Sequence, residues 1–536
     1  MSRYLDTKKA FVLYSEVANS PYFVDKSAML EELIPLIGQE RKYLCITRPR
    51  RFGKTVMANM ISSFFGRGVD SRALFEKLEI GKSEKFAENI NQYPVISMTL
   101  SEIPRACKTY EQYMNRIETG FVKDLKKAFP ECEVEEGDAV WDILNDIFEE
   151  TGSRFLFVLD EWDYLFHRDF ASEKEKKFYI QFLSNLLKDK PYVAMAYMTG
   201  ILPIAKYSSG SELNMFLEYT MVTEERFSDY FGFTETEVDD LYRRFLKIEP
   251  KPQVTREGLK VWYDGYHTKA GERVYNPRSV AASLTNNNLG SYWTSSGPYD
   301  EIFYYIENNV DEVRDDIALM VSGIPVPAQV QEYAAASMGL STKDEIFSAM
   351  VVYGFLSYEN GKVCIPNQEL MKKFDEMLGR EPSMGYVHRL AKESERMLRA
   401  TLAGDTETMM EILEYAHNTE IPLLSYNNEV ELTALVNLIY LAARDSYRIE
   451  REDKAGKGYV DFIFYPERRK SDDAIILELK VDAEPEEAIR QIKERGYALR
   501  LRGRTGEEPK YTGRILAVGI SYDRKTKKHR CLMESL

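Results

Sequence analysis

The chain has little of what disulfide-rich, zinc-binding and membrane-spanning proteins require. Its 536 residues include five cysteines, which are scattered and form no Cys-x-x-Cys pair. This distribution indicates neither a disulfide framework nor a zinc site, and it fits a reducing compartment. The sequence has no run of about 18 apolar residues and no apolar signal-peptide core at its start. We therefore expect a cytoplasmic protein without a membrane span.

The chain also lacks an excess of positive charge. Its 71 Lys and Arg stand against 86 Asp and Glu, a formal net charge of −15 at pH 7. This balance argues against a surface that is basic throughout, but it leaves a local basic face open. A hydrophobic content of 44% with 12% aromatic residues is typical of a folded chain. The length is too great for one core, and we expect about three domains.

A phosphate-binding loop is predicted near the N-terminus. An apolar run at residues 43–46 is followed by Arg-Pro-Arg-Arg-Phe-Gly-Lys-Thr at residues 48–55 and then by a helical pattern. Strand, loop, Gly-Lys-Thr and helix in this order predict a P-loop. The usual pattern has glycine where Arg48 stands, so an ordinary basic turn is the alternative reading of this stretch.

Each residue of the predicted loop would have its own role. Backbone N–H groups at the helix start, next to Arg51 and Gly53, would face the phosphates of a nucleotide. Lys54 would reach the β- and γ-phosphates, and the Thr55 hydroxyl would bind Mg²⁺. These residues are the candidate ATP-binding set, with Thr55 also a candidate metal ligand.

A second apolar run, residues 155–159, ends in two acids. An unbroken apolar run is typical of a parallel strand buried on both faces, and ligands bind beyond the carboxyl ends of such strands. Asp160 is therefore predicted to hold Mg²⁺, and Glu161 to act as the base that activates water. A buried strand with a charged exit turn is the alternative.

Residues 192–200 form a further strand-like run that ends in Thr199, placed like a sensor residue that contacts the γ-phosphate or the attacking water. A strand that simply ends in Thr-Gly is equally compatible with this pattern. Strands and helices alternate up to this point, which predicts a parallel sheet with helices on both faces. Arg226 and Arg278 are candidate arginine-finger or sensor residues, and nothing in the spacing selects either.

The middle of the chain is predicted to be mostly helical with aromatic interruptions. Aromatic residues recur at residues 262–266, 275 and 292–293, where they would form either a base-stacking surface or, more commonly, a core between helices. A capping box begins at Thr342, and Asn360-Gly361 separates two apolar runs, a strong hairpin signal. A helix followed by a hairpin predicts a small winged-helix-like module that joins domains rather than reads DNA.

A second constellation lies near the C-terminus, where a helix is followed by strand-like runs. Residues i and i+2 of a strand share a face, so Glu478 and Lys480 point the same way, and Asp461 joins them if its strand lies alongside. Two carboxylates would hold Mg²⁺, and the lysine would orient water and stabilise charge on phosphate. An exposed strand with alternating charges is the alternative. Residues 490–530 hold 13 Lys and Arg against four Asp and Glu, which suits a phosphate backbone or a solvated basic tail.

These segments together resemble a family of bacterial and archaeal proteins with an AAA-type ATPase-like domain followed by a PD-(D/E)XK nuclease-like domain. The resemblance covers nearly the whole chain. In the first half it rests on the segments at residues 22–26, 48–55, 159–163, 262–266 and 275–277. Members of that family carry Arg-Pro-Arg-Arg-Phe-Gly-Lys in place of the glycine-rich loop.

In the second half, the resemblance implies further site residues. Gln491 and Tyr497 match the Gln and Tyr of the family's helix after the Glu-x-Lys strand. An upstream helical acid, Glu429 or Glu431, would complete the metal site, and the choice between them is open. The sequence departs from the family's pattern at Tyr459, where relatives carry arginine. This difference puts part of the expected substrate binding in doubt.

The expected fold is α/β: an N-terminal P-loop sheet of AAA type, a helical and winged-helix-like middle, and a restriction-endonuclease-like C-terminal domain. The expected borders are 1–222, 223–378 and 379–536. The expected function is Mg²⁺-dependent cleavage of DNA, gated or powered by ATP, and a homo-oligomer is left open. The alternatives are a nucleotide-dependent switch that binds DNA or protein without cleavage, and an inactive ATPase that uses bound nucleotide for stability.

Overall fold

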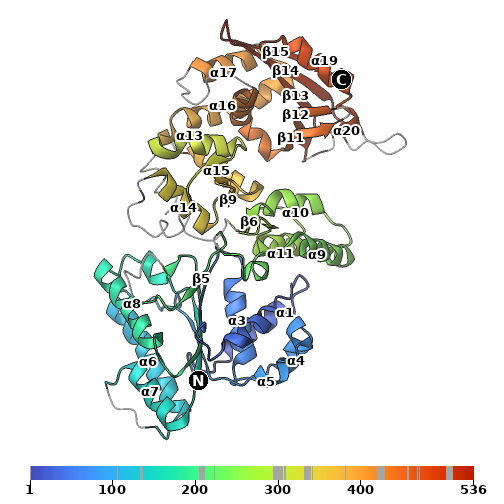
Figure 1. The fold of residues 1–536 in the computed structure, drawn as a ribbon. Coiled ribbons are helices and arrows are strands. Elements are labelled where there is room, and N and C mark those ends of the chain that lie inside the picture. Colours follow the sequence, from blue (N-terminus) through green and yellow to red (C-terminus); the bar gives the residue numbers. More distant parts are fainter. Residues whose placement is uncertain are drawn as a thin grey trace. The chain divides into compact units, whose positions relative to one another are not determined.

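The computed structural model divides the chain into two compact units, each built from two stretches of sequence (Figure 1). The first unit comprises Met1–Tyr299 and Ala328–Glu369, and the second comprises Asp300–Pro327 and Leu370–Leu536. The predicted domain borders after residues 222 and 378 stay predictions. The structure describes residues 2–105, 107–132, 137–204, 212–222, 224–293, 306, 310–330, 340, 342–380, 382–418, 429–455, 458–467, 469, 471–502 and 511–536.

A parallel sheet of five strands forms the centre of the first unit, as the sequence predicts. Its order is β2-β3-β4-β1-β5, and each neighbouring pair runs parallel. Strands β1, β3 and β4 are buried along their whole length, which explains their unbroken apolar sequences. The strands are β1 (Tyr43–Thr47), β2 (Val95–Thr99), β3 (Phe155–Asp160), β4 (Val193–Gly200) and β5 (Leu217–Tyr219).

Helices cover both faces of this sheet, and each face has its own apolar core (Figure 1). One face packs against α1 (Lys9–Ala18), α2 (Met29–Leu33), α3 (Lys54–Phe65), α4 (Arg72–Phe75) and α5 (Phe86–Asn89). The other packs against α6 (Tyr110–Ala128), α7 (Val140–Thr151) and α8 (Glu173–Leu187).

A small helical group follows the sheet, and its aromatic residues are buried. It contains α9 (Glu235–Ile248), α10 (Arg256–Tyr263), α11 (Pro277–Asn286) and the short strands β6 (Tyr266–His267) and β7 (Arg273–Val274). Trp262, Tyr263 and Tyr275 belong to its apolar core. These aromatic side chains therefore pack between helices and do not form a base-stacking surface.

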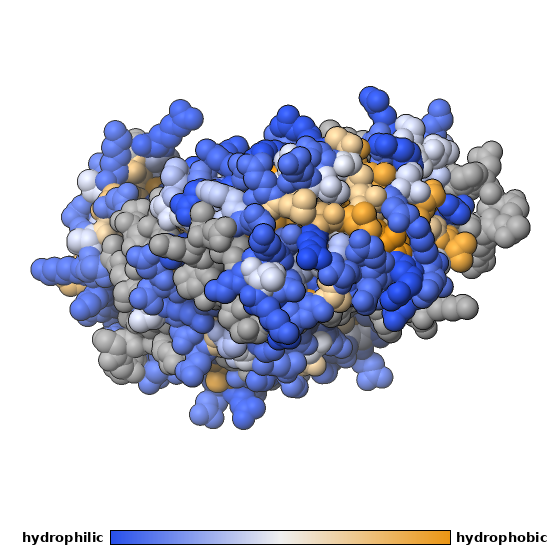
Figure 2. Space-filling view, turned by 90° about the horizontal axis from the view of Figure 1, so that it is seen from above, coloured by the Kyte–Doolittle hydropathy of each residue, from blue (hydrophilic) through white to orange (hydrophobic). Residues whose placement is uncertain are grey.

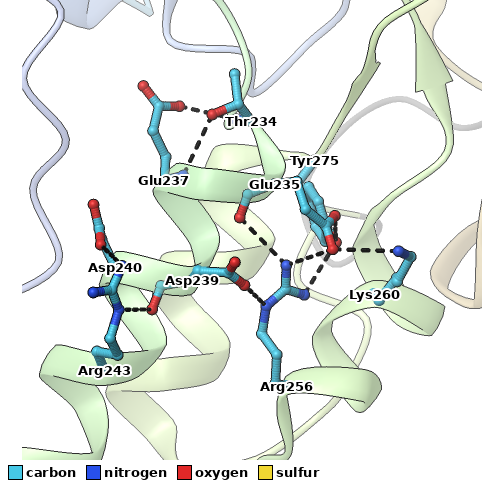
Figure 3. Close-up of polar contacts among 9 residues, drawn as sticks. All are labelled: Thr234, Glu235, Glu237, Asp239, Asp240, Arg243, Arg256, Lys260 and Tyr275. Atoms are coloured by element: carbon cyan, nitrogen blue, oxygen red, sulfur yellow. Dashed lines mark hydrogen bonds and ion pairs between the residues drawn. The ribbon is translucent and has the colours of Figure 1, made fainter.

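Figure 3 shows the polar contacts that tie this group together. The Arg256 guanidinium donates to Asp239 at 2.6 Å and to the Tyr275 hydroxyl at 3.0 Å, and it lies 2.9 Å from Glu235. Tyr275 in turn donates to Glu235 at 2.5 Å. Because Tyr275 comes just before α11, this network fixes the position from which α11 starts.

The predicted helix and hairpin are both present in the first unit. Thr342 caps α14 (Lys343–Tyr353) with a complete capping box. Strands β9 (Ser357–Glu359) and β10 (Lys362–Cys364) pair antiparallel. Asn360 and Gly361 between them both have positive φ, as a tight two-residue hairpin turn requires.

A mixed sheet of five strands, in the order β11-β12-β13-β14-β15, forms the core of the second unit. Only β13 and β14 run parallel; the other neighbours are antiparallel. An added Cβ at Gly519 would lie 2.5 Å from the Pro485 carbonyl oxygen, so α19 packs very closely on β14. The elements of this unit are β8 (Val326–Pro327), α13 (Val310–Val321), α15 (Gln368–Arg380, which begins at the unit border), α16 (Tyr386–Ala403), α17 (Thr406–Asn418), α18 (Glu429–Ile439), β11 (Tyr447–Ala455), β12 (Gly458–Pro466), β13 (Ala474–Val481), α19 (Pro485–Arg495), α20 (Leu499–Arg502), β14 (Ile515–Asp523) and β15 (Lys528–Ser535).

One face of the molecule is mostly polar. Hydrophilic residues cover most of the face drawn in Figure 2 and surround a smaller apolar area. In the described part of the second unit, the large apolar side chains that stay exposed are Tyr415 and Leu499. Within the described ranges, no helix combines the length and the apolar character needed to cross a membrane.

Candidate nucleotide and nuclease sites

The predicted phosphate loop connects β1 to α3 and turns at two residues with left-handed backbone. Gly53 has φ 90° and stands directly before Lys54, the first residue of α3. Arg51 has φ 71°, a value that residues other than glycine rarely adopt. The loop thus leads straight into the N-terminus of a 12-residue helix, where backbone N–H groups bind anions.

Lys54 lies at the centre of this loop. Its side chain is buried, and its Nζ donates to the carbonyl oxygens of Arg48 and Pro49, both at 2.8 Å. Burial lowers the pKa of Lys54 to about 8, although the carboxylates of Asp163 and Asp160 oppose this shift. The ammonium group therefore pairs with its own loop, through contacts that a phosphate would improve.

Arg48 fills the place of the first glycine in the usual pattern. It is only 2% exposed, and its Nη1 donates to the carbonyl oxygens of Thr47 and Tyr219, both at 2.8 Å. Its guanidinium also lies 4.9 Å from the centre of the Phe231 ring. Arg48 thus holds the start of the loop against β5 and the segment that follows it.

Asp160 and Thr55, the predicted Mg²⁺ ligands, lie next to each other, and their role as ligands stays a prediction. Asp160 ends β3 and is 2% exposed, with its Oδ1 accepting from the backbone N–H of Glu161 at 3.1 Å. Burial raises the pKa of Asp160 to about 6, although the adjacent Thr55 side chain lowers it. Its buried Oδ2 has no hydrogen-bond partner among the described residues, so the carboxylate offers a hard oxygen to a cation.

Glu161, the predicted base, has φ 54° in the left-handed region. Such a backbone costs about 1–3 kcal/mol for a residue other than glycine, and Glu161 shares it with turn residues elsewhere in the described chain, such as Asn360. Its side chain lines the cavity described below.

Thr199 is fully buried, and its hydroxyl donates to the Ile46 carbonyl oxygen at 2.8 Å across the β1–β4 pair. Its contact bridges two strands, and the sensor role stays a prediction. Asp163, for which the sequence pattern predicts no role, also lines the cavity. Its Oδ2 accepts from the N–H groups of Ile201 and Leu202 at 2.9 and 2.8 Å. Burial works against its ionisation, but His167 and these N–H groups outweigh burial and lower its pKa.

A cavity of about 990 Å³ opens in front of the loop, within the first unit. This volume is at the upper end of the range for ligand pockets and accommodates a nucleoside triphosphate. Tyr14, Phe23 and Phe233 give it apolar walls suited to a base, and α11 contributes Arg278. Of the two candidate arginines, Arg278 lines the cavity, whereas Arg226 lies outside it.

The second candidate site lies at the sheet of the second unit. Strands β12 and β13 pair with Phe462 opposite Leu477. Continued by one residue pair, this register sets Asp461 opposite Glu478. Both residues then lie on the face of the sheet that packs against α19, because side chains two residues apart in a strand share a face. The Asp461 Oδ2 accepts from the N–H of Leu479 at 2.7 Å, which places its carboxylate between the two strands.

Glu478 gathers the remaining predicted residues around its carboxylate. The Lys480 Nζ donates to Glu478 Oε1 at 3.1 Å, and the Gln491 side chain, from α19, donates to the same oxygen. Gln491 also reaches the Tyr497 hydroxyl at 3.4 Å. The structure thus brings Asp461, Glu478, Lys480, Gln491 and Tyr497 into one group.

Glu478 is 3% exposed, and its buried Oε2 has no hydrogen-bond partner among the described residues. Burial, reinforced by the charge of Asp461, raises the pKa of Glu478 to about 7, although Lys480 lowers it. A buried carboxylate oxygen beside a second carboxylate fits a divalent cation. The cation would offset the energetic cost of burying the Glu478 charge and the repulsion between the two carboxylates.

This pKa predicts how pH affects the metal-free protein. The pKa of Glu478 is 4.5 in the unfolded chain and about 7 in the folded protein. The protonated Glu478 carboxyl therefore stabilises the folded protein fully below pH 4.5, and this contribution is lost as the pH rises through 7. The loss amounts to about 3 kcal/mol. Glu478→Gln should therefore flatten the dependence of unfolding free energy on pH, measured by denaturant unfolding with chelator. Equal slopes for wild type and variant would contradict the raised pKa.

The third predicted ligand lies outside what the structure describes. Glu429 and Glu431 lie on α18, but their side chains, like that of Tyr459, are outside the described residues. Among the described residues, no group of three or more His, Cys, Asp or Glu side chains forms a metal site. The described part of the site consists of a carboxylate pair with a lysine, a glutamine and a tyrosine.

The sequence of the chain matches two family models in these regions. Residues 14–209 match a family described as predicted AAA-ATPase, and residues 431–530 match the PD-(D/E)XK nuclease superfamily. The chain joins an AAA-ATPase-like domain to a PD-(D/E)XK nuclease-like domain. The resemblance drawn from its motifs is thereby confirmed, and its domains are those of an enzyme.

Solved structures similar to the chain come from archaea. The Walker-type ATPase of Pyrococcus abyssi is 12% identical with a TM-score of 0.36, over 65% of this chain and 94% of that one. The ORC2 protein of Aeropyrum pernix is 10% identical with a TM-score of 0.32, over 69% and 92%. The ORC1 protein of Aeropyrum pernix, in complex with DNA, is 14% identical with a TM-score of 0.27, over 67% and 92%. No curated protein matches the chain.

Proposed function

We propose that this protein binds ATP and cleaves DNA with Mg²⁺, and that ATP gates or powers the cleavage. The observation that carries the proposal is the group around Glu478, in which a second carboxylate, a lysine and a glutamine meet a buried carboxylate oxygen without a protein partner. The cysteine distribution supports a cytoplasmic location.

In the ATPase-like domain, Lys54 would leave the carbonyl oxygens of its own loop and bind the β- and γ-phosphates. Thr55 and Asp160 would hold Mg²⁺, which neutralises phosphate charge when bound. Glu161 would accept a proton from the attacking water, because it is the acid that follows Asp160 and faces the cavity.

In the nuclease-like domain, Asp461 and Glu478 would hold Mg²⁺, which would polarise the scissile phosphate and lower the pKa of water when bound. Lys480 would stabilise the charge that develops on the phosphate. Gln491 would orient Glu478, since its amide donates to the oxygen that also contacts Lys480. The basic residues of the last strands and helices would attract the DNA backbone.

Glu161→Gln should keep ATP affinity and reduce ATP hydrolysis. Glutamine fills the same space but cannot accept the proton from water, and binding does not need a base. The loss should be about 10²–10⁴-fold, the range of general-base effects. Release of phosphate and a separate binding titration measure the two properties. Hydrolysis at the wild-type rate would show that Glu161 is not the base.

A nucleotide-dependent switch that binds DNA or protein without cleavage is the second candidate. The observation that favours it is the phosphate loop, which has Arg48 where the usual pattern has its first glycine. Anisotropy of a labelled DNA duplex with ATP and with ADP, followed by gel analysis of the same duplex, separates the two functions. Nucleotide-dependent binding of DNA that stays intact would support the switch.

A further inference from the structure

The phosphate loop is held from outside by three residues that come much later in the chain. These residues, Tyr266, Trp293 and Gly354, are called the loop brace here, and all belong to the first unit. The Trp293 indole N–H donates to the Arg50 carbonyl oxygen at 2.9 Å. The Tyr266 ring meets the Phe52 ring edge to face, with centroids 4.9 Å apart. Both contacts fall on positions that are glycine or variable in an ordinary P-loop.

Of the three residues of the loop brace, Gly354 approaches the phosphate loop most closely. It ends α14 with φ 86°, and an added Cβ would lie 2.6 Å from the Cβ of Pro49. A distance under 3.0 Å requires one of the two backbones to move, because proline is not a flexible side chain. The Gly354 carbonyl oxygen also accepts from the Tyr266 hydroxyl at 3.0 Å. The end of α14 is therefore fitted against the loop itself.

The loop brace is also connected to α11, which lines the same cavity as the phosphate loop. Glu369 is 2% exposed, and its Oε1 accepts from the backbone N–H of Trp293 at 2.5 Å. Its Oε2 accepts from the hydroxyl of Ser279 at 2.7 Å. Ser279 lies on α11, which lines the cavity through Arg278 and its neighbours. One buried carboxylate thus ties the brace to the helix that faces the loop.

A glycine-rich loop adopts its phosphate-binding shape through its own backbone freedom, whereas this loop has one glycine, Gly53, within residues 48–55. Its shape depends on contacts: Arg48 with β5, Pro49 with Gly354, Arg50 with Trp293 and Phe52 with Tyr266. The carbonyl oxygens that hold Lys54 belong to two of these residues, Arg48 and Pro49.

We propose that the loop brace positions the phosphate loop, so that nucleotide binding and the packing of the helix–hairpin module at residues 342–366 stabilise each other. Tyr266, Trp293 and Gly354 are positioning residues, because they act on the nucleotide through the loop. Coupling of this kind is reciprocal: ATP must stabilise the module as much as the docked module favours ATP. The proposal rests on the proposed binding of ATP.

The hairpin provides a matched pair of variants. Gly354→Ala adds a methyl group at φ 86°, against Pro49, and Gly361→Ala adds one at φ 78°, with nothing within 4 Å. Both carry similar backbone strain, but only the first pushes on the loop. Gly354→Ala should raise the Kd for ATP about tenfold, within the usual range of coupling, while Gly361→Ala should leave it near the wild-type value. In a Pro49→Gly background, Gly354→Ala should cost less ATP affinity than it costs in the wild-type loop, because the atom that the methyl group meets is gone.

Hydrogen exchange in nucleotide-free protein tests directly whether the loop brace holds the phosphate loop in place. Gly354→Ala should speed exchange of the amides at residues 50–54, and Gly361→Ala should not. Trp293→Phe provides a milder variant, since it keeps a ring against Phe355 and loses the hydrogen bond to Arg50. Equal exchange in all three variants and wild type would overturn the proposal even if ATP binds. Faster loop exchange in Gly354→Ala than in wild type, together with a wild type that does not bind ATP, would keep the brace and reject the nucleotide function.

Discussion

Lys54→Ala will abolish the rise in melting temperature that ATP and Mg²⁺ give the wild-type protein. Lys54 is the buried cation at the centre of the loop, and alanine leaves the β- and γ-phosphates without the charge placed to reach them. A ligand at about 100 times its Kd stabilises a protein by about 2.7 kcal/mol, and this gain should disappear. The shift of each variant is measured against its own melting temperature without nucleotide, because alanine also leaves the Arg48 and Pro49 carbonyl oxygens without their donor.

The matched control is Lys176→Ala. Lys176 is also buried in the first unit, but it lies on α8 and pairs with Glu173 at 2.8 Å, away from the residues that line the cavity. This control should keep the full shift with ATP. Equal shifts for wild type and Lys54→Ala would rule out the P-loop assignment.

Asp461→Ala, Glu478→Ala and Lys480→Ala will each reduce DNA cleavage, but for different reasons. The first two remove carboxylates that offer oxygen to Mg²⁺, so they should weaken metal binding. Lys480→Ala should spare the metal and slow cleavage by about 10²–10³, or about 2.7–4 kcal/mol, as loss of an oxyanion-hole donor does. Cleavage measured across Mg²⁺ concentrations separates the two effects, since excess metal rescues only a weakened ligand set.

Lys493→Ala provides the control for charge alone. Lys493 lies on α19 and pairs with Glu534. The substitution Lys493→Ala therefore removes a positive charge from the same domain and leaves the group around Glu478 intact. At saturating DNA the variant should cleave at a rate near wild type, because the loss of one of the 13 Lys and Arg of residues 490–530 affects the affinity for the DNA backbone and not the reacting group. All four variants should keep the shift with ATP, because the P-loop lies in the other unit. Wild-type rates in the three site variants would mean that their side chains are structural.

Much of this arrangement follows from local sequence. The apolar runs of β1, β3 and β4 predict buried parallel strands, and the structure buries every residue of all three. The alternation of Glu478 and Lys480 predicts a shared face, and their side chains meet at 3.1 Å. The capping box at Thr342 and the Asn360-Gly361 turn are likewise signals carried by neighbouring residues.

Other features depend on contacts between distant residues, which leave no local pattern. The packing of Gly354 against Pro49 joins residues far apart in the chain, and a glycine that ends a helix looks the same with or without such a neighbour. Asp163 stands in a segment that the sequence analysis noted, but only the fold brings its carboxylate to the backbone after β4. Residues 310–327 belong to the second unit, a grouping by tertiary contacts that periodicity does not reveal.

Cleavage of plasmid DNA by the purified wild-type protein in Mg²⁺, with and without ATP, tests the proposed function most directly. The geometry around Glu478 predicts that the plasmid is cut and that chelation of the metal stops the reaction. The presence of an ATPase-like domain in the same chain predicts that ATP changes the rate. A plasmid that stays intact in Mg²⁺ under every nucleotide condition would contradict the nuclease function and leave the switch as the better explanation.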